Sequence, residues 1–259
     1  MTAAASGRAS GRVWTGSFYA WMALAFVATA FLGFVPTYWQ PVVAGKFEGN
    51  PIVHIHGLVF FSWTLFFLLQ SSLVANGHTL RHRSIGMIGL ALATLMTVLG
   101  LLIALNSLTM ATLQGARAAG EAFTILPIFD IAAFATFVGL AIANTSRPEV
   151  HKRLMLLSMI AILDAPVARP LLTYVFTNIP PGPPPVWIDY PTNALVDVFL
   201  VAAIVYDWRK IGRPHPVYIW GGASLVIWQL IRLPVSESAA WHSLMRDFAG
   251  LAGTFPKPT

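Results

Sequence analysis

Charged side chains interrupt several long apolar stretches of this sequence. Asp164 and Arg169 lie within the run MLLSMIAILDAPVARPLLTYVF, and Asp130, Asp197 and Arg232 lie in three other runs. A charge near the centre of a bilayer costs roughly 3 kcal/mol or more, so such residues usually face an internal site. Carboxylates and guanidinium groups gathered there can bind a small polar molecule or pass protons. Alternatively, they form ion pairs that only hold helices together.

The depths of the carboxylates agree with a shared site. At a rise of about 1.5 Å per residue, Asp130, Asp164 and Asp197 each lie roughly 10 to 12 Å from one surface of an apolar core about 30 Å thick. Helical spacing places further polar side chains, with amide, imidazole and indole groups, on the same helix faces. We expect them at the depth of these carboxylates or between the carboxylates and the nearer membrane surface. The predicted polar site comprises Asp130, Asp164, Arg169, Asn193, Asp197, Gln229, Arg232, His54, His56, Trp63 and Gln70.

Two histidines near the other membrane surface, away from the predicted polar site, suggest a cofactor. His82 in HRSIG and His151 in HKRLM open two parallel spans, each with an arginine nearby. Such a pair can clamp a b-type haem, with Arg83 and Arg153 pairing its propionates. The alternative is that these histidines are interfacial residues among basic anchors.

The sequence HIHG offers a second use for imidazoles. His54 and His56, with Asp130 or Asp197, provide nitrogen and oxygen ligands suited to zinc or another divalent ion. A zinc-activated water there would make a membrane hydrolase. The alternative is that both histidines cap and gate the mouth of the polar site. The chain has no cysteine, so thiolate metal sites and disulfides are excluded.

The composition indicates an integral membrane protein. Of the 259 residues, 56% are hydrophobic and 10% are charged, against about 25% charged in soluble domains. Apolar runs of about 20 residues predict an all-α bundle of about seven transmembrane helices. The predicted spans are 17–40, 56–75, 85–107, 122–144, 152–176, 190–207 and 216–234. No nucleic-acid motif is present, so the expected surroundings are the lipid bilayer, with a small-molecule ligand or a partner membrane subunit.

The distribution of basic residues predicts the orientation. Cytoplasmic loops of membrane proteins carry the excess of Lys and Arg, which here places the N-terminus in the cytoplasm and the C-terminus in the periplasm. The cytoplasmic segments then hold Arg8, Arg12, Arg81, Arg83, Arg147, Lys152, Arg153, Arg209, Lys210 and Arg213, against Lys46, Arg117, Arg246 and Lys257 outside. The seventh run contains no lysine, which excludes a retinal Schiff base.

The chain divides into three parts. Residues 1–16 form a cytoplasmic tail, residues 17–235 the transmembrane domain, and residues 236–259 a periplasmic amphipathic helix and tail. Pro166 and Pro170 flank Arg169, so we expect the fifth span to be kinked beside its charges.

Four motifs together resemble an uncharacterised family of bacterial multi-pass inner-membrane proteins. They are HGLVFFSWTLFFLLQ, HRSIG, HKRLMLL followed by LDAPVAR, and VDVFLVAAIVYD, and the resemblance covers most of residues 52–235. It implies a location in the bacterial inner membrane and no particular activity. The histidine pair is also faintly similar to that of the di-haem, ascorbate-reducing membrane cytochromes.

Four functions remain open from the sequence. The first is proton-linked binding or transport of a small molecule at the polar site. The others are a redox protein with haem at His82 and His151, an accessory or scaffold subunit, and a metal-dependent membrane hydrolase.

Overall fold

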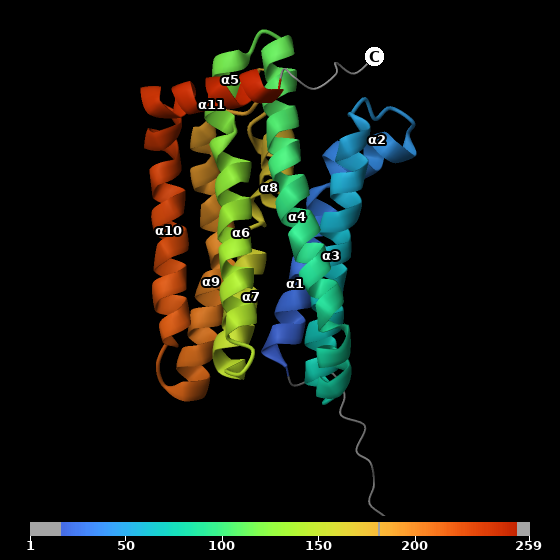
Figure 1. Ribbon diagram of the computed structural model, residues 1–259, viewed down its shortest axis with the longest axis vertical. Helices are drawn as coiled ribbons and strands as arrows, with labels where there is room; N and C mark the ends of the chain where they lie inside the picture. Colours follow the sequence, from blue (N-terminus) through green and yellow to red (C-terminus); the bar gives the residue numbers. More distant parts are fainter. Residues whose placement is uncertain (1–16, 181, 253–259) are drawn as a thin grey trace, which may run out of the picture.

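The computed structural model describes residues 17–180 and 182–252, which form helices and no strand. The predicted cytoplasmic tail, residues 1–16, lies outside the described residues, as do residues 253–259. Most helices run along one common axis as a bundle (Figure 1). Their bounds are α1 Phe18–Gly33, η1 Val35–Trp39, α2 Gln40–Val43, α3 Pro51–Ala75, α4 Thr79–Leu113, α5 Arg117–Phe123, α6 Ile125–Ala143, α7 Pro148–Ile160, α8 Asp164–Pro170, η2 Leu171–Val175, η3 Val186–Ile188, α9 Asp189–Ile211, α10 Pro216–Ser236 and α11 Ala239–Ala252.

Six helical segments are long and apolar enough to cross a bilayer, which confirms an all-α, multi-pass membrane protein. They are Phe18–Val43, Pro51–Ala75, Thr79–Leu113, Arg117–Ala143, Pro148–Val175 and Val186–Ile211. The helix at the predicted seventh span, α10, is not among them. It contains Gln229 and Arg232 as well as two adjacent glycines, which lower its mean hydropathy.

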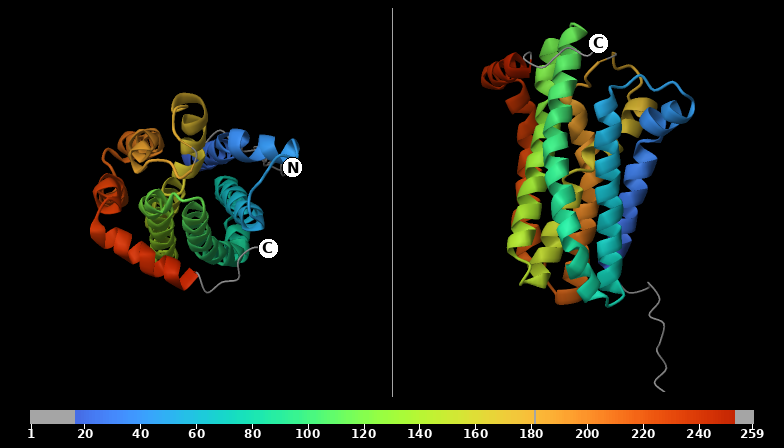
Figure 2. Two further views of the ribbon diagram at one scale, coloured as in Figure 1. Left: turned by 90° about the horizontal axis from the view of Figure 1, so that it is seen from above. Right: turned by 45° about the vertical axis from the view of Figure 1, so that its right-hand side comes forward.

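The loops divide the bundle into two ends. The α3–α4, α6–α7 and α9–α10 connections lie at the lower end in Figure 1, and α11 crosses the upper end beside α5. We call these the basic end and the α11 end. The basic end carries Arg81, Arg83, Arg147, Lys152, Arg153, Arg209, Lys210 and Arg213. Figure 2 shows α11 extending along one side of the bundle from α10.

Side-chain burial follows the pattern of a protein in lipid. The large side chains of Trp63 and Phe134 are buried within the bundle, whereas Leu58, Met87 and Trp220 point outward and are about 70% exposed or more. Outward apolar side chains find a favourable solvent in lipid tails.

An apolar layer fills the middle of the bundle. On α7, Leu156, Leu157 and Met159 are buried, and Trp63 donates its indole N–H to Met159 Sδ at 3.1 Å. Phe134 packs edge-on against Trp63, with ring centroids 5.2 Å apart. These five side chains, the apolar layer, separate the polar groups at the two ends of the bundle.

The fifth predicted span is broken as its prolines suggest. The helix stops at Ile160 and resumes as α8 at Asp164, because Pro166 has no N–H to donate to the carbonyl of Ile162. Pro170 likewise has no N–H for the carbonyl of Pro166, and a π-helical turn, η2, follows it. The break places Asp164 at the start of a new helix in the interior.

Gly33 on α1 provides the space that this break needs. A Cβ at Gly33 would overlap the carbonyl group of Pro166, whereas a Cβ at Gly86 on α4 would meet nothing within 4 Å. The close approach of α1 to α8 therefore requires a residue without a side chain at position 33.

We expect Gly33→Ala to lower the free energy of unfolding by about 1–3 kcal/mol, because a methyl group there forces α1 and α8 apart. The matched substitution Gly86→Ala should leave stability unchanged or slightly higher, since Ala is the better helix former. Thermal unfolding of both variants in one detergent checks this. Equal melting temperatures would contradict the proposed close contact.

Candidate functional site

Arg232 on α10 is the centre of a buried ionic cluster. Its Nη1 donates to Asp164 Oδ2 at 2.5 Å and to Asp189 Oδ1 at 3.0 Å, and its Nη2 donates to Asp130 Oδ1. Arg232 as a whole is 3% exposed. Four helices, α6, α8, α9 and α10, thus meet at one side chain. We call Arg232, Asp130, Asp164 and Asp189 the Arg232 cluster.

The sequence predicted three members of this cluster and missed the fourth. Asp130, Asp164 and Arg232 are members of the predicted polar site, whereas Asp189 lies just outside the predicted sixth span, 190–207. In the structure α9 begins at Asp189, directly after the 3-10 turn η3. The side chain is buried and reaches Arg232. An acidic residue directly before a predicted span was the available signal.

Asp197, Asn193 and Gln229 do not join the Arg232 cluster. Asp197 Oδ1 accepts a hydrogen bond from Gln229 Nε2 at 3.1 Å, and these residues line a separate cavity of about 440 Å³ between α9 and α10. A helix turns 100° per residue, so Asp197 points about 80° away from Asp189, which lies eight residues earlier. Depth alone could not distinguish these two directions.

A large cavity lies beside the Arg232 cluster. Its volume is about 610 Å³, and its lining includes Asp130, Asp164 and Asp189. The lining continues to Asn50, to Gln114 and to Pro183–Pro185, which belong to connections at the α11 end. The cavity therefore extends from the ionic cluster in the interior toward the α11 end.

Arg169 also lines this cavity but has a different environment. It has no ion pair within the described residues; its guanidinium carbon lies 5.9 Å from the ring centroid of Phe34. His56 lines the cavity as well, with its ring 4.0 Å from that of Phe60, and its Nδ1 is buried without a partner in the described part of the chain. Arg169 thus presents to the cavity a guanidinium group that forms no ion pair with the described residues.

The other predicted members have separate surroundings. His54 Nδ1 lies 2.8 Å from the hydroxyl of Tyr38, and Trp63 belongs to the apolar layer. Across residues 17–180 and 182–252, no three His, Asp or Glu side chains come together as a metal site. A metal ion at His54 and His56 stays a prediction. It would need further ligands besides the His, Asp and Glu side chains of the described residues.

The predicted haem histidines lie side by side at the basic end. The ring centroids of His82 and His151 are 6.3 Å apart, and the ring planes are inclined at 79°. His151 Nδ1 lies 2.8 Å from the carbonyl oxygen of Ala141. Arg83 is exposed, but Arg153, the other predicted propionate partner, is already engaged by carboxylates.

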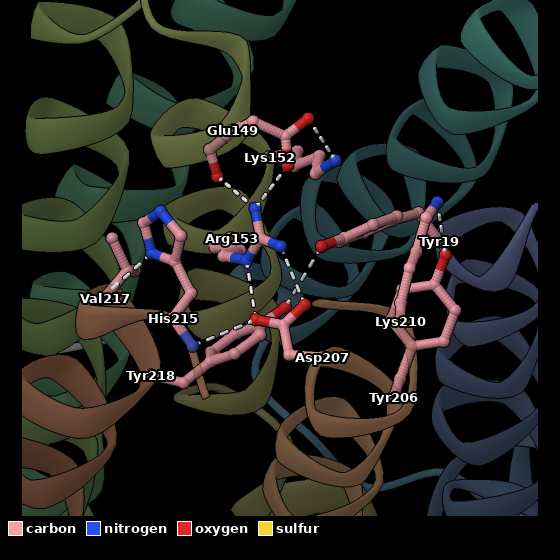
Figure 3. Close-up of polar contacts among 10 residues, drawn as sticks. All are labelled: Tyr19, Glu149, Lys152, Arg153, Tyr206, Asp207, Lys210, His215, Val217 and Tyr218. Carbon is pink, nitrogen blue, oxygen red and sulfur yellow. Dashed lines mark hydrogen bonds and ion pairs between the residues drawn. The ribbon is translucent and has the colours of Figure 1, made fainter. Parts of the chain in front are cut away.

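Arg153 forms the second buried ion pair, shown in Figure 3. Its Nε and Nη2 donate to the two carboxylate oxygens of Asp207 on α9 at 2.8 and 2.7 Å, and its Nη1 donates to Glu149 Oε2 at 2.7 Å. Asp207 is fully buried, and the ring of Tyr218 lies 5.8 Å from the guanidinium carbon. The predicted pairing of Arg153 with a propionate is therefore not supported. We call Arg153, Glu149 and Asp207 the Arg153 cluster.

His215 connects this cluster to the start of α10. Its backbone N–H donates to Asp207 Oδ2 at 3.3 Å, and its Nδ1 accepts the N–H of Val217 at 3.2 Å as the cap of α10. Burial, and then the charge of Arg153, lower the pKa of His215. The ring is therefore neutral at physiological pH, which the capping hydrogen bond requires because an acceptor nitrogen carries no proton.

Comparisons with known proteins return no match to a family model, to a curated protein or to a solved structure.

Proposed function

We propose that this chain binds a small amphiphilic molecule with an anionic group in the 610 Å³ cavity and moves it across the membrane together with protons. The observation that carries the proposal is the position of the Arg232 cluster on the wall of that cavity, within an apolar bundle. Three carboxylates and a guanidinium are more than a structural ion pair needs. Ionisable groups at such a depth usually serve a transport or proton pathway.

The ligand class follows from the remaining lining. Arg169 offers a guanidinium group that forms no ion pair with a carboxylate of the described residues, so its hydrogen-bond donors suit an anionic group. Phe34, Phe60 and Phe61 supply an apolar wall for the rest of the molecule. The volume falls within the range of about 300–1,000 Å³ that is usual for small-molecule sites.

The charge balance of the Arg232 cluster is the reason for including a proton in the proposal. Three carboxylates share one guanidinium, so the Arg232 cluster carries excess negative charge when all of them are ionised. A proton held by this group of carboxylates reduces that excess. An anion bound at Arg169 adds negative charge to the same cavity, so the arrival of the ligand favours arrival of the proton. This coupling supports symport.

The proposal includes a membrane topology. We take α10 as a seventh span because it lies alongside α6 and α9 in Figure 1. The concentration of Lys and Arg at the basic end supports a cytoplasmic location for that end, so that the cavity opens toward the periplasm. The motif resemblance supports the bacterial inner membrane as the location.

Small monocarboxylates test the proposal. We expect at least one member of a series from acetate to octanoate, with benzoate, to raise the melting temperature of the purified protein. The same compound should acidify the lumen of proteoliposomes loaded with a pH-sensitive dye faster than that of protein-free liposomes, because undissociated carboxylic acids also cross a bilayer unaided. Arg169→Gln should weaken binding about ten-fold or more, because a hydrogen bond to a charged group contributes about 1.5–3 kcal/mol.

Lys46→Gln, which removes an exposed charge at the α11 end, is the matched control and should behave as the wild type. A wild-type protein that no carboxylate stabilises would contradict anion binding. Binding without any movement of protons would contradict the coupling.

A further inference from the structure

The pair formed by His82 and His151 has the dimensions of two imidazoles on one metal ion. His82 lies in the first turn of α4 and His151 in the first turn of α7. Two imidazole nitrogens on opposite sides of a shared ion, each about 2.0 Å from it, place the ring centres about 6 Å apart. The measured centroid separation is 6.3 Å. Neither ring belongs to the cavity or to the two ionic clusters.

The tautomer of His151 leaves the correct nitrogen available. A backbone carbonyl only accepts hydrogen bonds, so the contact of 2.8 Å with Ala141 places the proton on Nδ1. The lone pair of Nε2 is then free. Histidines that bind metals usually make this outer hydrogen bond to a carbonyl or carboxylate, which fixes the ring and the tautomer.

Unpartnered polar atoms mark the same place. His82 Nδ1 and both side-chain amide atoms of Gln70 are buried without a hydrogen-bond partner among the described residues. The His82 ring forms a hydrogen bond with the backbone of Gln70, so the unpartnered atom of this ring is Nδ1 alone. Buried polar atoms nearly always have a partner, so this part of the bundle is suited to a bound group that brings polar atoms or a metal.

We propose that His82 and His151 are the two axial ligands of one b-type haem held between α4 and α7 at the basic end. Zinc sites use three or four protein ligands, and no third metal-ligating side chain joins these two in the described part of the chain. A porphyrin supplies four equatorial nitrogens and needs only two axial ligands from the protein. Arg83, which is exposed and without an ion pair in residues 17–180 and 182–252, suits a propionate.

Absorption spectroscopy of the whole chain tests this proposal. Protein expressed with the haem precursor δ-aminolaevulinate, purified in detergent and then titrated with hemin, should bind one hemin per chain. It should show a Soret band and, after dithionite reduction, the sharp α-band of six-coordinate haem b. His82→Ala and His151→Ala should each lose the α-band. His78→Ala, which removes an exposed histidine just before α4, should keep it.

A conservative variant tests ligation separately from folding. His151→Met retains a side chain that ligates haem iron, so we expect bound haem with a spectrum shifted toward that of a histidine–methionine pair. Wild-type protein without a Soret band at saturating hemin would overturn the proposal. An unchanged six-coordinate spectrum in His82→Ala and His151→Ala, or in His151→Met, would also overturn it. These readouts are independent of carboxylate binding in the cavity.

Discussion

Arg232→Gln is expected to destabilise the folded protein by about 3–5 kcal/mol, the usual effect of removing one partner from a buried ion pair. The substitution leaves Asp130, Asp164 and Asp189 facing one another without the guanidinium that now hydrogen-bonds to all three. The expected signs are a large drop in melting temperature and a lower yield of monodisperse protein in detergent.

Arg169→Gln is the matched control for this prediction. It makes the same chemical change at an arginine with no ion pair in the described residues, so stability should change little. Adding Asp130→Asn and Asp189→Asn to Arg232→Gln should recover much of the loss, because it removes two of the unpaired charges. Wild-type stability in the single variant Arg232→Gln would show that these contacts do not hold the bundle together.

Asp207→Leu is expected to lower the free energy of unfolding by a similar amount, about 3–5 kcal/mol, because it leaves Arg153 buried beside an apolar side chain. The double variant Arg153→Met with Asp207→Leu should regain most of the stability, since apolar pairs often replace buried ion pairs without cost. A double-mutant cycle of melting temperatures measures the coupling.

Glu149→Gln provides the contrast within the same cluster. Glu149 also hydrogen-bonds to Arg153, but its side chain is 62% exposed, whereas that of Asp207 is 0% exposed. Exposed ion pairs contribute about 0–1 kcal/mol, so Glu149→Gln should be nearly silent. Equal losses in Glu149→Gln and Asp207→Leu would contradict the assignment of the stabilisation to the buried pair.

Helical segments and their depths were predictable because hydropathy and helical rise are local properties of the sequence. The membrane class, the positions of six of the seven predicted spans and the shared depth of Asp130 and Asp164 all follow from them. The helix ends were predicted less well than the helix centres. The helix α4, Thr79–Leu113, extends several residues beyond the predicted span at both ends. Polar residues at the membrane interface continue a helix without lowering its stability, so hydropathy does not mark where the helix ends.

The direction in which a side chain points was not predictable in the same way. Apolar side chains cover both the lipid face and the interior of a membrane helix, so the sequence does not mark which face is inside. For this reason Asp197 was expected in the main site, although it pairs with Gln229 between α9 and α10. The pairing of Arg153 with Asp207 was missed because both lie at span ends, where charged residues are ordinarily solvated.

The apolar layer has an electrical consequence for the proposed transport. In the proposed transporter, water that fills the cavity would bring the electrical potential of the α11 side inward as far as the Arg232 cluster, and the Arg153 cluster lies at the opposite, basic end. The membrane voltage then falls mainly over the short distance occupied by Trp63, Phe134, Leu156, Leu157 and Met159. An ion or proton that crosses this layer experiences most of the field, about 2.3 kcal/mol per charge at 100 mV, in a single step.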